Sequence, residues 1–63
     1  MEICFDVPGE RSRIVASSPI IPRVGETIVL RRHNYSVTNV KYEFVERTLA
    51  DVAEHVIIHL ERL

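Results

Sequence analysis

The chain has 63 residues, 46% of them hydrophobic, with a formal net charge of −1 and a single cysteine. This length allows one domain, residues 1–63, and so small a domain buries only about 60% of the surface that its unfolded chain exposes. Because Cys4 is alone, no intramolecular disulfide can form. The three histidines lack the spacing of a zinc site, so we expect no metal and no cofactor. Close core packing or oligomerisation is then left to stabilise the fold.

The charge balance and the hydropathy pattern limit the partners and the location. A net charge near zero does not indicate the broadly basic surface of many nucleic-acid-binding proteins. No apolar run approaches the roughly 20 residues of a membrane-spanning helix. Acidic Glu2 and Asp6 stand where a secretory signal would carry positive charge. We therefore expect a cytoplasmic protein that does not enter a membrane.

Two short strands are predicted in the first third of the chain. Residues 3–7 alternate between apolar and polar side chains, which is typical of a half-buried strand, and the pair Pro8-Gly9 then indicates a turn. A second strand is predicted over residues 13–16. Pro22 disfavours a place inside a sheet and indicates an extended connection.

A hairpin is predicted in the middle of the chain. Residues 27–30 are β-branched and apolar and form its first strand, with Ile28 and Leu30 facing the core. The tight turn is expected at His33-Asn34, because Asn adopts positive φ at modest cost. The second strand then covers residues 35–44.

That second strand contains a shift in the alternation. Its apolar residues are Tyr35 and Val37, followed at the opposite parity by Val40, Tyr42 and Phe44. One extra residue near Thr38-Asn39, a β-bulge, would bring both sets to the same face. The sequence therefore predicts a bent strand of the kind that small barrels need.

The C-terminal segment has two interpretations. Apolar residues recur at helical spacing over residues 49–63, and Thr48 with Asp51 could form a capping box. The alternative is a strand over residues 55–61, with Val56, Ile58 and Leu60 facing inward. The run 56–58 has a strong strand preference, so the strand is favoured. A helical turn near residues 48–53 could precede it.

Part of the chain resembles a known group of short proteins. Residues 22–30 read Pro-Arg-Val-Gly-Glu-Thr-Ile-Val-Leu, residues 35–40 follow as Tyr-Ser-Val-Thr-Asn-Val, and residues 56–62 fit a closing strand. This pattern is similar to that of short, mostly uncharacterised bacterial and phage proteins. The resemblance implies a small SH3-like β-barrel and transfers no catalytic or binding residue. The predicted fold is mainly β, a small five-stranded SH3-like barrel.

Two groups of side chains are candidates for binding. The candidate binding residues are Arg31, Arg32, His33 and Tyr35 in one group, and His55, Ile57 and His59 in the other. In the favoured interpretation both groups contact a protein partner, which would bury the outward isoleucine between the two histidines. In the alternative, the first group forms an arginine-rich hairpin that contacts phosphate or RNA, with the tyrosine stacking on a base. The two histidines would lie about 13 Å apart on a strand, too far to share one metal ion.

No motif in the sequence indicates catalysis. Gly9 and Gly25 stand alone, so there is no glycine-rich phosphate loop, and no Ser-His-Asp arrangement has a supporting spacing. We expect no enzyme. The favoured function is a non-enzymatic protein-binding module, acting as a homo-oligomer or as a phage- or mobile-element-derived modulator of a host protein. The alternatives are a nucleic-acid-binding barrel that uses the arginine-rich hairpin, and an oligomer that sequesters a small ligand.

Overall fold

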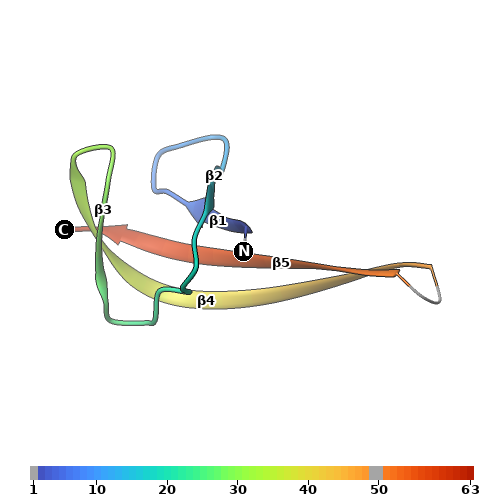
Figure 1. The fold of residues 1–63 in the computed structure, drawn as a ribbon. Helices are drawn as coiled ribbons and strands as arrows, with labels where there is room; N and C mark the ends of the chain where they lie inside the picture. Colours follow the sequence, from blue (N-terminus) through green and yellow to red (C-terminus); the bar gives the residue numbers. More distant parts are fainter. Residues whose placement is uncertain (1, 49–50) are drawn as a thin grey trace.

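The computed structural model describes residues 2–48 and 51–63, with side chains described for residues 2–44 and 55–63. The described residues form five strands and no helix. The strands are β1 (Glu2–Asp6), β2 (Ile14–Ser17), β3 (Thr27–Leu30), β4 (His33–Thr48) and β5 (Asp51–Arg62). They make one sheet in the order β2-β1-β5-β4-β3, which curls into a half-barrel (Figure 1). The prediction of a mainly β fold with five strands is confirmed, and the half-barrel is consistent with a small barrel.

The pairing of the first and last strands joins the two ends of the chain. β1 lies parallel to β5, with Ile3 beside Val56 and Phe5 beside Ile58, while every other neighbouring pair of strands is antiparallel. As a result β5 is the central strand of the sheet, with β1 on one side and β4 on the other. No pairing between β2 and β3 is found among the described residues, so the barrel is open between them.

The core occupies the concave face of the curled sheet. Its buried members are Ile3, Phe5, Val7, Tyr35, Val37, Val56, Ile58 and Leu60. Ile28 and Leu30 of β3 pack against this cluster, as do Ile14 and Ala16 of β2. The inward positions predicted from period-2 alternation in β1, β3 and β5 are confirmed.

The predicted β-bulge in β4 is also confirmed. Val37 pairs with Leu60 and Asn39 pairs with His59, so Thr38 is the extra residue of β4. The Thr38 hydroxyl donates a hydrogen bond to the backbone carbonyl of His59, 3.2 Å away. This extra residue returns Val40 to the core side of the strand, where it packs against the buried cluster.

The prediction that the β3–β4 turn lies at His33-Asn34 is wrong. Leu30 pairs with His33, so the two-residue turn is Arg31-Arg32. Both arginines have positive φ, 50° and 67°, the backbone that such a tight hairpin turn requires. The core positions of the two strands determine the register, and the register leaves these two residues for the turn although Asn and Gly are favoured there.

The strand interpretation of the C-terminal segment is confirmed, and the strand is longer than expected. Residues 51–53 belong to β5 and pair with β4 in an antiparallel ladder from Thr48 and Asp51 onward. The helical turn expected near residues 48–53 is therefore wrong at residues 51–53, because their backbone is paired with β4. Residues 49 and 50 of that expected turn lie outside the described residues.

The β4–β5 hairpin extends well past the rest of the sheet (Figure 1). β1 pairs with β5 only over Val56–His59, which lie opposite Tyr42–Asn39 of β4. Beyond that point residues 43–48 and 51–55 form a two-stranded ribbon, here called the arm. The arm makes the molecule elongated, with extents of 42 × 23 × 17 Å. In the part of the chain that is described, no helix is long and apolar enough to cross a membrane.

Candidate protein-docking surface

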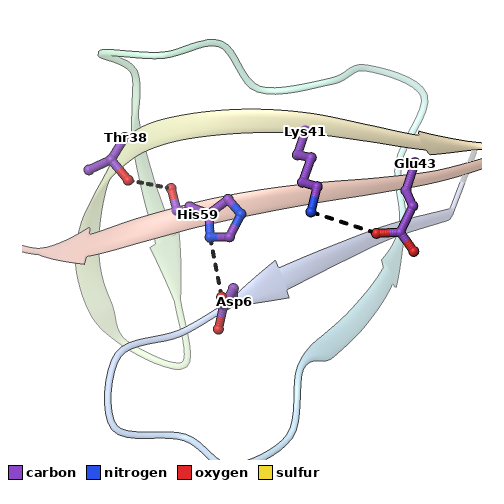
Figure 2. Close-up of polar contacts among 5 residues, drawn as sticks. All are labelled: Asp6, Thr38, Lys41, Glu43 and His59. Carbon is purple, nitrogen blue, oxygen red and sulfur yellow. Dashed lines mark hydrogen bonds and ion pairs between the residues drawn. The ribbon is translucent and has the colours of Figure 1, made fainter.

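The outer, convex face of the sheet does not present Ile57 to solvent. Ile57 is 1% exposed, so the expectation that it points outward for a partner to bury is wrong. It lies on the central strand, beside Cys4 of β1 and Lys41 of β4. Figure 2 shows the Lys41 side chain extending from β4 across β5. A residue with a strand on each side and a long side chain over it is buried even on the outer face.

The remaining outer face carries exposed polar and ion-paired side chains. The His59 Nδ1 atom lies 3.2 Å from the Asp6 carboxylate, and Lys41 Nζ lies 3.8 Å from the carboxylate of Glu43 (Figure 2). His55 is exposed and pairs in register with Glu43. His55 and His59 thus lie on the same face as predicted, separated by the buried Ile57. Pairs as exposed as these contribute little to stability.

The predicted basic hairpin lies at one end of the molecule. Arg31 and Arg32 form the turn, and a guanidinium nitrogen of Arg62 lies 2.9 Å from His33 Nδ1. Arg31 also approaches Glu10 of the β1–β2 loop, at 3.9 Å, which offsets part of the positive charge. Three of the four predicted hairpin residues are therefore exposed at one tip.

Tyr35, the fourth residue of that group, is part of the core. Its ring is buried on the concave face and meets the His33 ring edge-on, with 6.5 Å between the ring centroids. A base could stack on Tyr35 only if this core packing opened. The parity of Tyr35 matches that of Val37, and this shared face places both residues in the core.

An apolar groove that the sequence did not indicate lies on the concave side of β4. It has a volume of about 400 Å³ and is lined by Ile21, Pro22, Arg23, Val24, Val40 and Tyr42. One wall comes from the connection between β2 and β3, and the other from β4 past its bulge. The groove therefore depends on how this connection is attached to the sheet.

Hydrogen bonds attach the connection to β4 beside the groove. The backbone N–H of Gly25 donates to the carbonyl of Val37 at 2.9 Å, and the N–H of Val37 donates to the carbonyl of Glu26 at 2.9 Å. The N–H of Glu26 also donates to the carbonyl of Arg23, and the Glu26 carboxylate accepts a hydrogen bond from the N–H of Arg23. Gly25 has a φ of 92°, which a glycine adopts without strain. The turn holds Val24 at the rim of the groove.

Large apolar side chains around the groove are exposed. Val24 is 62% exposed, Tyr42 is 49% exposed and Phe44, one step further along β4, is 65% exposed. Tyr42 and Phe44 have the same parity as the core residue Val40, so they continue the apolar stripe of the concave face. The β2–β3 connection lies beside this stripe at Val40 and Tyr42, and Phe44 is open to solvent. The alternation of apolar residues in the sequence predicted that Tyr42 and Phe44 lie on the concave face. Only the structure shows that this part of the face is uncovered.

The described residues show no built metal site. No group of three or more His, Cys, Asp or Glu side chains is placed to hold an ion within residues 2–44 and 55–63. No family model matches the chain, and no curated protein or solved structure matches it.

Proposed function

We propose that this protein is a non-enzymatic protein-binding module that docks a partner in the apolar groove and on the adjoining face of the arm. One observation carries the proposal: Val24, Tyr42 and Phe44 are exposed side by side with a groove of about 400 Å³. Exposed apolar surface of this kind typically marks an interaction site on a soluble protein. Aromatic residues such as Tyr42 are also enriched where protein partners meet.

The shape of the site favours a partner segment in an extended conformation. The groove runs between the β2–β3 connection and β4. An extended segment places alternate side chains on one face, where they can fill apolar pockets of such a groove. Val40 and Tyr42 would form the floor of such a pocket, with Val24 at its rim.

A matched pair of valine variants tests this proposal. Val24 lies at the groove, whereas Val29 of β3 pairs with Asn34 away from the groove and is 70% exposed. A binding peptide is first selected with the immobilised protein from a random peptide library and then titrated by isothermal calorimetry. We expect Val24→Asp to weaken binding at least about tenfold, because a desolvated carboxylate is costly, and Val29→Asp to leave it unchanged. Equal effects of both variants, or no selectable peptide, would refute the docking site.

The basic tip supports a second candidate function, nucleic-acid binding. Arg31, Arg32 and the pair of Arg62 with His33 concentrate positive charge at one end of the molecule. Such a tip would contact phosphates without base stacking, because Tyr35 is buried. Fluorescence anisotropy with labelled single-stranded RNA tests it over a range of salt concentrations. Phosphate contacts predict affinity that falls steeply with salt and is reduced by Arg31→Ala with Arg32→Ala. Absence of binding at low salt would exclude this function.

A further inference from the structure

Among the described residues, one edge of β4 lacks a ladder partner beside the groove, whose other wall is the β2–β3 connection. β3 pairs with β4 only over His33–Ser36, and the β2–β3 connection adds hydrogen bonds only to Val37. Past Val37 no ladder partner is found among the described residues on the side of β4 that faces away from β5. An unpaired strand edge is a template for another strand.

In an antiparallel ladder, successive residues of a strand direct their N–H and C=O groups to opposite sides of the strand. This rule shows which residues of β4 direct these groups toward the open edge. Asn34 uses its carbonyl toward the β5 side, where it accepts a hydrogen bond from the N–H of Leu63 at 3.1 Å, and Val37 bonds to Glu26 on the other side. The extra residue Thr38 shifts this alternation by one. Past the bulge, therefore, Val40, Tyr42 and residue 44 direct their N–H and C=O groups toward the open edge.

The side chains along the edge have a palindromic pattern. Residues 40–44 read Val-Lys-Tyr-Glu-Phe, with the apolar residues on the concave face and Lys41 and Glu43 on the outer face. If a second copy of this segment is laid antiparallel with Tyr42 opposite Tyr42, each Lys41 lies opposite a Glu43. Apolar residues then face apolar residues, with Val40 opposite Phe44.

Other registers are less favourable. Moving the two-fold axis to Lys41 places two lysines opposite each other, and moving it to Glu43 does the same with two glutamates. Like charges in directly opposed positions destabilise a strand pair. If one strand slips by an odd number of residues from the register with Tyr42 opposite Tyr42, the charged face of one strand meets the apolar face of the other. The axis through Tyr42 also opposes two residues whose backbone groups point at each other, as an antiparallel ladder requires.

We propose that the edge of β4 is occupied by β4 of a second copy of this chain, antiparallel about a two-fold axis through Tyr42. Within one copy Lys41 lies across β5 and pairs with Glu43 at 3.8 Å, and both side chains are exposed, at 57% and 45% (Figure 2). Pairing of two copies would exchange this exposed pair within each chain for two pairs across the axis. This inference rests on the proposed function, because it uses the same apolar face. It deepens that function by making the binding surface composite, with the Tyr42 rings of two copies joining the two grooves.

A charge-swap cycle tests the pairing. The measurement is sedimentation velocity of the full chain over a range of protein concentrations. We expect a dimer, and we expect Lys41→Glu or Glu43→Lys alone to weaken it at least about tenfold, because each places two like-charged pairs across the axis. The double variant Lys41→Glu with Glu43→Lys restores opposite charges and should restore the dimer. Glu61→Lys, a charge reversal elsewhere on the outer face, is the control and should not change the dissociation constant.

Disulfide trapping tests the position of the axis. In a Cys4→Ser background, Tyr42→Cys would place two thiols on residues whose Cα atoms lie about 5.5 Å apart, within the range of a disulfide. Oxidation should therefore link Tyr42→Cys into a covalent dimer. Phe44→Cys should not link, because its two copies would lie about 14 Å apart along the strands.

The outcomes separate this inference from the proposed function. A monomer at every concentration, or a double swap that stays as weak as the single swaps, would overturn the dimer. Neither result affects the comparison of Val24→Asp with Val29→Asp in peptide binding, which tests docking in the groove of one copy. Conversely, a dimer with the expected swap behaviour and no peptide binding would retain the pairing and refute the docking function.

Discussion

Ile57 provides a sharp test of the fold, because its burial on the outer face cannot be deduced from alternation. The change is Ile57→Ala. Ile57 is 1% exposed and lies between Cys4 and Lys41 on the neighbouring strands. If the Ile57 side chain is buried in this way, its truncation to alanine leaves a cavity. If it instead faces solvent on an interaction surface, truncation removes little from the stability of the domain.

The expected loss follows from the atoms removed. Ile→Ala deletes three carbon atoms, which at about 0.8 kcal/mol each correspond to about 2.4 kcal/mol of transfer free energy. The unfilled cavity adds to this, and such substitutions cost about 2–5 kcal/mol in total. At typical values per residue, 63 residues correspond to a free energy of unfolding of about 3–9 kcal/mol. We therefore expect Ile57→Ala to remove about 3 kcal/mol, a large part of the stability of the protein.

The assay is urea denaturation followed by far-UV circular dichroism at one fixed protein concentration, since self-association would shift the transition. Ile57→Val, expected to cost about 0.5–1.5 kcal/mol, keeps the test quantitative if the alanine variant does not fold. Val29→Ala is the control, because Val29 is 70% exposed and should lose less than about 1 kcal/mol. A loss for Ile57→Ala no larger than that for Val29→Ala would contradict the burial argument.

Three further changes test the turns and the bulge. Replacing the turn with Arg31→Asn and Arg32→Gly should raise the free energy of unfolding by about 1 kcal/mol, because both positions have positive φ; an unchanged urea midpoint would count against the assigned turn. Gly25→Ala should lower the free energy of unfolding by about 1 kcal/mol, and with it the melting temperature. The cause is backbone strain alone, since a Cβ there would meet no atom within 4 Å. A melting temperature equal to that of the parent would refute this. Deleting Thr38 removes the bulge and turns the rest of β4 over, so we expect no cooperative thermal transition by circular dichroism; a normal transition would show that the bulge is dispensable.

The elements themselves were largely predictable, because strand alternation is a local signal. The apolar positions of β1, the inward pair Ile28 and Leu30, and the bulge at Thr38 each follow from the spacing of apolar residues along a few positions. The β3–β4 turn was placed two residues too late. Turn propensity favoured Asn34, but the packing of both strands in the core determines the register and leaves Arg31 and Arg32 in the turn.

The candidate site was less predictable, because it depends on which strands are neighbours. Ile57 was expected to be exposed, and it is buried because β1 lies parallel to β5 and makes β5 the central strand. Tyr35 was expected at a binding tip and is in the core. Tyr42 was correctly placed on the core side of β4, but its exposure in the wall of the groove depends on where the β2–β3 connection lies.

By itself, then, the sequence determined the strand content, the face of most residues and the bend in β4, since all of these depend on side-chain spacing within one segment. Only the tertiary structure decided the parallel pairing of the first and last strands, the burial of Ile57, the groove beside Val40 and the open edge of β4. These features arise from contacts between segments far apart in the chain. Many such arrangements satisfy the same alternation, and packing of the whole sheet selects one of them.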